Sequence, residues 1–183
     1  MAKLAASTYG EALFELAKES GNADGMLLEA QTVKAAFTDN PELSQILNHP
    51  KIGKNKKIAA MEEIFSQAVS KDMMGFICLA VQKDRQDDIP AILDYVIAKI
   101  KDYKRIGIVK VKTPMELTPE QKTKVENKIL ATSDYKTLEV EYETDESLIG
   151  GMVIRIGDRI VDSSIKRKLS DLSRQLLNIQ LNM

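Results

Sequence analysis

The chain has 183 residues, of which 44% are apolar and 29% charged, and its 26 basic and 27 acidic residues leave a net charge of −1. This composition is typical of a soluble folded protein, and the lack of a positive excess argues against a polyanion-binding domain. A single cysteine, Cys78, excludes an internal disulfide framework, and a single histidine, His49, argues against a His-rich metal site or a Ser-His-Asp triad.

Helical periodicity dominates the chain up to about Arg105. Apolar residues recur there at steps of three and four, in stripes at residues 9–16, 26–37, 58–65, 73–80 and 89–100. Asn40 followed by Pro41 marks one further helix start, and Pro50 ends that helix. Helices of this length are unstable alone, so we expect five or six of them to bury their stripes together.

Strand patterns appear from Ile106 onward. Alternating apolar residues predict strands at residues 106–112, 138–142, 148–156 and 159–161. A tight turn at Gly157 joins the last two strands. Thr118 and Gln121 form a capping box that starts a helix between the first two. We therefore expect an α+β fold, mainly α, with a helical bundle in residues 1–105 and a small strand-helix domain in residues 106–183.

The last predicted helix begins near Ser164 and is strongly amphipathic. Its apolar residues step by four, three, four and three, at Ile165, Leu169, Leu172, Leu176 and Ile179. We expect this stripe to pack on its own sheet, because two heptads are short for an independent coiled coil. Acceptance of a partner helix stays open as the alternative.

No pattern in the chain predicts a reaction centre. A phosphate-binding loop needs glycines at a strand-to-helix junction, whereas Gly150-Gly151 lies between two predicted strands, so we expect a backbone bend. Cys78 lies in an apolar run and is expected in the core, and His49 before Pro50 is expected in a turn. Two groups of charged residues, a lysine cluster and an acidic strand face, are candidate binding surfaces, but both are expected simply to face water. They are Lys51, Lys54, Lys56, Lys57, Glu139, Glu141 and Glu143.

The chain is also too polar along its length to cross a membrane as a helix. Its longest wholly apolar run, residues 76–81, is far shorter than a membrane span, and residues 1–10 lack the apolar core of a secretory signal. We expect a protein of a reducing compartment without direct membrane insertion.

Several motifs together resemble the delta subunit of bacterial F-type ATP synthase, the counterpart of the mitochondrial oligomycin-sensitivity-conferring protein. The resemblance covers nearly the whole chain. Its most specific stretch is Leu138-x-Val140-x-x-x-Thr144-Asp145-x-x-Leu148-x-Gly150-Gly151-Met152-x-Ile154-Arg155-x-Gly157. Supporting pieces are Tyr9-Gly10-x-Ala12-Leu13-Phe14-x-Leu16-Ala17, Asn40-Pro41-x-Leu43, Pro50-x-Ile52 and Leu117-Thr118-Pro119-x-Gln121. Gly10 departs from the family, which more often has Ala there.

The resemblance implies a stator subunit that catalyses nothing and uses no cofactor and no metal. In the family, an N-terminal six-helix bundle holds the N-terminal segment of an alpha subunit, and the C-terminal domain meets the b subunits of the peripheral stalk. The protein then lies on the cytoplasmic face of the bacterial membrane and couples proton-driven rotation to ATP synthesis. Contact residues for the alpha subunit are expected at Tyr9, Leu13, Met73 and Phe76, and for the stalk at Leu172, Leu176 and Ile179.

Gly150, Gly151 and Gly157 are expected to specify the fold rather than to bind a ligand. Two other functions stay open from the sequence. One is a small nucleotide-binding protein that uses the glycine pair, and the other is a nucleic-acid-binding protein. The near-zero net charge of both halves argues against the second.

Overall fold

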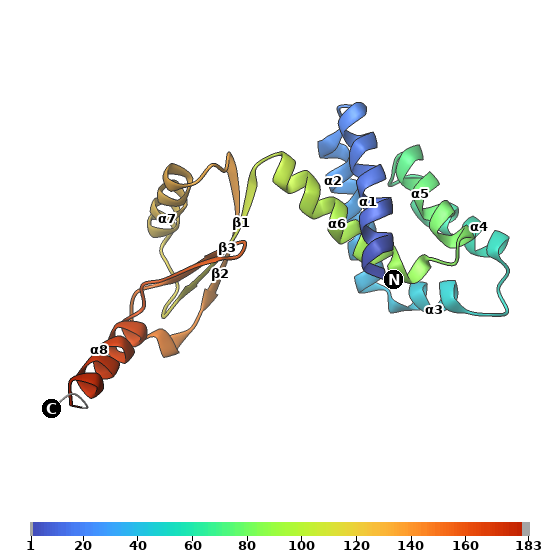
Figure 1. The fold of residues 1–183 in the computed structure, drawn as a ribbon. Helices are drawn as coiled ribbons and strands as arrows, with labels where there is room; N and C mark the ends of the chain where they lie inside the picture. The colour runs from blue at the N-terminus through green and yellow to red at the C-terminus, as the bar shows by residue number, and fades with distance from the viewer. Residues whose placement is uncertain (1, 181–183) are drawn as a thin grey trace. The chain divides into compact units, whose positions relative to one another are not determined.

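The fold is seen in a computed structural model that describes the backbone of residues 2–180 and the side chains of residues 6–175 (Figure 1). The chain divides into two compact units, unit 1 from Met1 to Lys101 and unit 2 from Asp102 onward. This division lies within the last turn of a helix that ends at Tyr103, whereas the sequence predicts a boundary between residues 105 and 106. Each unit has its own core.

Unit 1 is the predicted helical bundle. In the part of the chain that is described, it contains six α-helices and one short 3₁₀ helix. Their bounds are α1 Ala2–Glu19, α2 Ala23–Asp39, α3 Pro41–Asn48, α4 Lys54–Phe65, α5 Lys71–Gln82, η1 Gln86–Asp88 and α6 Ile89–Tyr103. Every apolar stripe predicted in residues 1–105 lies on one of these helices, which confirms the mainly helical fold class.

Aliphatic side chains from all six helices form the core of unit 1, with few aromatic rings among them. The fully buried positions include Val33, Leu47, Met61, Ile77 and Leu93. Each such side chain stabilises the fold by about 1.5–3 kcal/mol relative to an exposed one. Burial of this kind, rather than helix propensity, holds the short helices together.

Side-chain caps set several of the helix ends. The Asn22 side chain accepts a hydrogen bond from the Gly25 amide at the start of α2, and the Ser70 hydroxyl accepts one from Met73 at the start of α5. Asn40 precedes Pro41 as predicted, but its side-chain amide donates instead to the Ala36 carbonyl at the end of α2. It therefore closes one helix rather than capping the next.

Unit 2 is built on a four-stranded sheet. Its elements, as far as the chain is described, are β1 Ile106–Thr113, α7 Pro119–Thr132, β2 Thr137–Thr144, η2 Glu146–Leu148, β3 Val153–Ile156, β4 Arg159–Asp162 and α8 Ile165–Gln180. The strand order is β2-β1-β3-β4, with β1 and β2 parallel and the other pairs antiparallel. The parallel pair needs a crossover, and α7 supplies it with the predicted capping box at Thr118.

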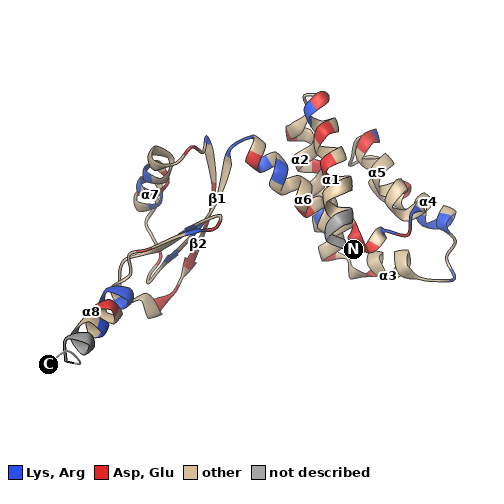
Figure 2. Ribbon diagram, viewed as in Figure 1, with Lys and Arg blue, Asp and Glu red and all other residues tan. Residues whose placement is uncertain are grey.

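The two faces of the sheet differ as alternation requires. On one face, Val109 and Val111 of β1 pack against Ile129 of α7. On the other, cross-strand ion pairs join Lys110 to Glu141 at 2.7 Å and Lys112 to Glu143 at 3.0 Å. Figure 2 shows these opposite charges on neighbouring strands. The predicted acidic face of β2 is therefore paired with lysines of β1.

One predicted strand is shorter than expected. Strand pairing begins only at Val153, because the segment before it turns sharply instead of continuing the alternation predicted from residue 148. Leu148 ends the 3₁₀ helix η2, and both Ile149 and Gly151 have positive φ angles. The expected bend at the glycine pair is thus larger than a bulge and includes Ile149.

Gly10 of α1 lies against Tyr95 of α6. A Cβ atom at position 10 would overlap the Tyr95 ring, whose hydroxyl donates a 2.7 Å hydrogen bond to Glu11. Glycine thus allows the close approach of α1 and α6 in this chain, at the expense of about 1 kcal/mol of helix propensity. By contrast, a Cβ at Gly75 of α5 would meet open space.

We expect Gly10→Ala to lower the free energy of unfolding by about 1 kcal/mol, because overpacking against Tyr95 exceeds the gain in helix propensity. The matched control is Gly75→Ala, which should raise the same quantity by up to about 1 kcal/mol. Urea denaturation followed by circular dichroism measures both. Equal stabilisation by the two substitutions would contradict the role given to Tyr95.

Candidate functional site

Most of the residues predicted to bind a partner in unit 1 lie inside its core. Leu13, Met73 and Phe76 are exposed by only 3%, 0% and 6%. Tyr9 is partly exposed, and its ring lies 6.5 Å from that of Phe76, centroid to centroid. The apolar stripe found in the sequence is therefore real, but three of its four selected residues face the bundle interior.

Their exposed neighbours form an apolar strip along the adjacent helices α1 and α5. We define the α1/α5 strip as Tyr9, Ala12 and Leu16 of α1 with Gly75 and Leu79 of α5. Leu16 is 44% exposed and Leu79 is 40% exposed, and Ala12 and Gly75 are exposed small residues. Large apolar side chains beside small ones offer a surface against which another helix can pack. Sequence periodicity located these helices but could not tell which side of each faces outward.

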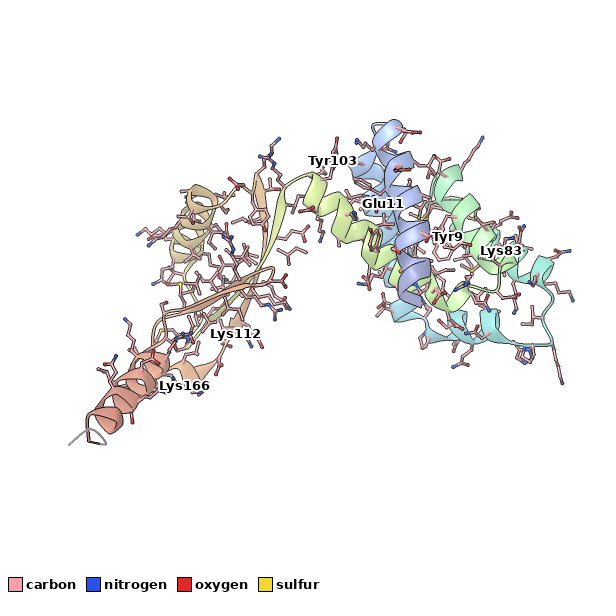
Figure 3. All side chains as sticks on the ribbon, viewed as in Figure 1. Tyr9, Glu11, Lys83, Tyr103, Lys112 and Lys166 are labelled. Carbon is pink, nitrogen blue, oxygen red and sulfur yellow. The ribbon has the colours of Figure 1, made fainter. Side chains whose placement is uncertain are left out.

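The opposite side of α1, toward α6, is polar. Glu11 accepts hydrogen bonds from Tyr95 and, at 3.2 Å, from Lys99, whose ammonium group also lies 5.5 Å from the Tyr95 ring centre. The Tyr95 hydroxyl and then Lys99 lower the pKa of Glu11, and the same contact with Glu11 raises the pKa of Lys99. Figure 3 labels Tyr9 and Glu11 on α1. The polar network leaves the α5 side of α1 as its apolar side.

The apolar stripe of α8 is exposed in unit 2. Ile165, Leu169 and Leu172 are 42%, 53% and 54% exposed. The side chains of Leu176 and Ile179, the other two predicted stalk contacts, lie outside the described residues. The expectation that this stripe packs on its own sheet is wrong for the described residues, because α8 packs chiefly against η2. Periodicity identifies an apolar face without saying what covers it.

Gly150 and Gly151 hold the start of α8 close to the backbone before β3. A Cβ on Gly150 would overlap the Ile165 side chain, and a Cβ on Gly151 would overlap the Ser163 carbonyl. The Ile165 amide donates to the Gly150 carbonyl at 3.0 Å. The pair thus faces the chain's own backbone and side chains. Gly157, with φ of 54°, forms the tight turn between β3 and β4.

Ile149 has an unusual backbone conformation for a β-branched residue. Its φ and ψ are 65° and −40°, and the Gly150 amide donates across it to the Leu148 carbonyl at 2.7 Å. This is close to the strained classic γ-turn. The Ile149 side chain is 64% exposed, so packing does not offset the strain. The turn sets the direction in which the chain reaches the glycine pair.

Two aspartates stabilise the ends of the same junction. Asp145 caps η2, and its pKa is lowered by hydrogen bonds from Ser147. Asp162 accepts a hydrogen bond from the Ser164 amide at 2.9 Å, just before α8, and its pKa is lowered by hydrogen bonds from the Ser164 side chain and amide. Each cap favours the ionised carboxylate.

The single cysteine and the single histidine lie in surroundings that do not favour a catalytic role. Burial, followed by the nearby Glu62, raises the pKa of the Cys78 thiol, which disfavours a reactive thiolate. His49 accepts a hydrogen bond from the Lys51 amide within its turn. The described residues hold no group of three or more His, Cys, Asp or Glu side chains placed to bind a metal ion.

The predicted lysine cluster is divided between different surroundings. Lys54 donates to the Gln82 carbonyl and pairs with Asp84, whereas Lys57 is buried, at 8% exposure. The cluster is therefore not a uniform solvated patch.

No described helix is both long and apolar enough to span a bilayer.

Comparisons with known proteins give one consistent result. A family model described as "ATP synthase delta (OSCP) subunit" matches residues 5–176. ATP synthase subunit delta of Lachnoclostridium phytofermentans is 46% identical over 181 residues, which cover 99% of this chain and 100% of the relative. The subunits delta of Halalkalibacterium halodurans and Nostoc sp. are 34% and 31% identical, with 94% of both chains covered in each case.

A solved structure shares the fold. A chain of the cryo-EM structure of the Toxoplasma gondii mitochondrial ATP synthase hexamer matches with a TM-score of 0.70 and 17% identity, covering 94% of this chain and 97% of that chain. At this identity the likeness shows the fold alone.

We expect Ile149→Gly to raise the free energy of unfolding by about 1 kcal/mol, because glycine adopts a positive φ without steric cost. As a control, Ile160→Gly within strand β4 should lower it by about 0.5–1 kcal/mol. Chemical denaturation of the two variants measures the difference. A destabilised Ile149→Gly protein would show that the γ-turn is not strained.

Acidification should weaken the start of α8. The pKa of Asp162 is lowered in the folded chain, so its stabilising contribution is present above the unfolded pKa of about 3.9 and is lost as the pH falls through the folded value. Between about pH 5 and pH 2, the wild type should lose unfolding free energy faster than Asp162→Asn. Parallel pH profiles of the two proteins would contradict the capping role.

Proposed function

The chain belongs to the ATP synthase delta (OSCP) subunit family, a peripheral-stalk stator component of F-type ATP synthase, and from this premise we propose how its two units make their contacts. Unit 1 binds the N-terminal segment of an alpha subunit along the α1/α5 strip. Unit 2 binds the b subunits of the peripheral stalk through α8. The protein thereby holds the catalytic head against the torque of the rotor.

The single observation that carries this proposal is that each unit has an exposed apolar surface on its helices. Unit 1 exposes the α1/α5 strip, and unit 2 exposes the α8 stripe formed by Ile165, Leu169 and Leu172. A subunit that links two other proteins needs two separate docking surfaces. Exposed apolar patches with polar surroundings are typical of protein contacts.

The energetics of helix docking suit a permanent link. A stator must remain bound through many rotations, and a nanomolar dissociation constant corresponds to about −12 kcal/mol. Burying a large aliphatic side chain contributes about 1.5–3 kcal/mol before the losses of association are subtracted. Several such side chains on each helix are therefore needed.

The contact residues of unit 1 are assigned to exposed positions. Leu13 and Met73 are part of the bundle core and would have to leave it to touch a partner. Leu16 and Leu79 lie on the same two helices and are accessible. Tyr9 remains one of the proposed contact residues. The buried Phe76 is not, but its ring packs against the ring of Tyr9.

We propose no catalytic role for the chain. The Ile165 side chain and the Ser163 carbonyl fill the space beside the glycine pair. A nucleotide-binding loop at these glycines therefore receives no support. The balanced charge likewise gives no support to nucleic-acid binding. The proposed location is the cytoplasmic face of the bacterial membrane, where the protein is held peripherally through the complex.

Binding of a peptide from the alpha-subunit N-terminus tests the assignment in unit 1. We expect the full chain to bind it with a helical peptide conformation, and Leu16→Asp or Leu79→Asp to weaken binding at least about tenfold, because a carboxylate is buried at the contact. Calorimetry measures the dissociation constants.

Leu28→Asp is the matched control. Leu28 is 66% exposed on α2, away from the strip, so its substitution introduces the same charge on the same unit without altering the contact. Circular dichroism checks that each variant is folded. Unchanged peptide affinity in both strip variants, or an equal loss in the control, would refute the α1/α5 site.

A further inference from the structure

The stripe of α8 has basic residues along both of its edges. Lys166 and Lys168 lie on opposite sides of the line through Ile165, Leu169 and Leu172, at the positions that flank the seam in a heptad. Lys166 also donates to the Ser147 hydroxyl at 3.2 Å, and Figure 3 labels it near the start of α8. Lys168 makes no ion pair within the described residues.

The acidic residue among the described side chains of α8 does not neutralise these edges. Asp171 lies 3.8 Å from Arg167, one turn earlier, on the side of the helix away from the stripe. In the following heptad the flanking positions are Ser173 and Gln175, which carry no charge. The edges of the seam are therefore positive in the first turn and uncharged at the next flanking positions, Ser173 and Gln175.

The width of the stripe indicates a helix rather than a lipid surface as its occupant. A helix lying in a membrane interface presents a broad apolar face, commonly with aromatic residues. The described face of α8 is a narrow seam at steps of four and three, without an aromatic residue, and the polar Ser173 lies directly beside it. Such a seam matches one partner helix.

From these observations we infer that the partner of α8 is an amphipathic helix with carboxylates beside its own apolar seam, facing Lys166 and Lys168. This inference rests on the proposed binding of α8 to the peripheral stalk and specifies the chemistry of that partner. Flanking charges of opposite sign select partner and register in paired helices. The contact between α8 and its partner helix is accordingly apolar along the seam. Its affinity depends on salt through the ion pairs at the first turn of α8.

The test measures binding of a soluble fragment of the b subunit to the full-length chain at about 50 mM and about 300 mM salt. We expect Lys166→Glu/Lys168→Glu to weaken binding at least about tenfold at low salt, and less at high salt. Lys168→Glu alone, which disturbs no ion pair of the described residues, should show part of this loss. Lys124→Glu/Lys128→Glu on α7 makes the same charge change and should leave affinity unchanged.

A seam variant, Leu172→Asp, separates this inference from the function on which it rests. Loss of binding in Leu172→Asp with unchanged, salt-independent binding in both lysine variants would overturn the inference and leave the stalk contact intact. Binding that survives Leu172→Asp as well would overturn both. Binding of the wild type to vesicles of phosphatidylcholine and phosphatidylglycerol, with none to the b fragment, would assign the basic edges to lipid instead.

Discussion

An amphipathic helix is stable in water only when another surface covers its apolar face, and this requirement organises the whole chain. In unit 1 the helices cover one another, and their aliphatic residues reach nearly complete burial. In unit 2 one face of the sheet is covered by α7, and the apolar stripe of α8 is left exposed. Each unit therefore keeps an apolar helix surface that its own packing does not cover.

The junction before α8 is built to direct that helix rather than to bury it. The γ-turn at Ile149 and the close backbone contact at Gly150 and Gly151 bring Ile165 against the turn, while Asp162 caps the next residues. Hydrogen bonds and small residues thus set the direction of α8 with little apolar contact. Such an arrangement suits a helix whose packing is completed by another protein.

Local sequence patterns predicted most of the helices and strands. Backbone turns and the burial of individual side chains depend on tertiary packing, which those patterns do not contain. Three- and four-residue steps located the helices, and Thr118 with Gln121 marked the start of α7. The residues before Val153 alternate like a strand, but the backbone turns at Ile149 because η2 and the start of α8 meet there. Leu13 and Leu16 share one apolar stripe, and only the packing of the whole bundle decides that the first is buried and the second exposed.

The central claim is that one molecule links two partners through separate units. Sedimentation velocity of the full-length chain mixed with the alpha-subunit peptide and the b-subunit fragment tests it most directly. The account predicts a ternary complex in which each partner binds with the same affinity whether or not the other is present. Mutually exclusive binding, or a chain that associates with only one of the two, would contradict it.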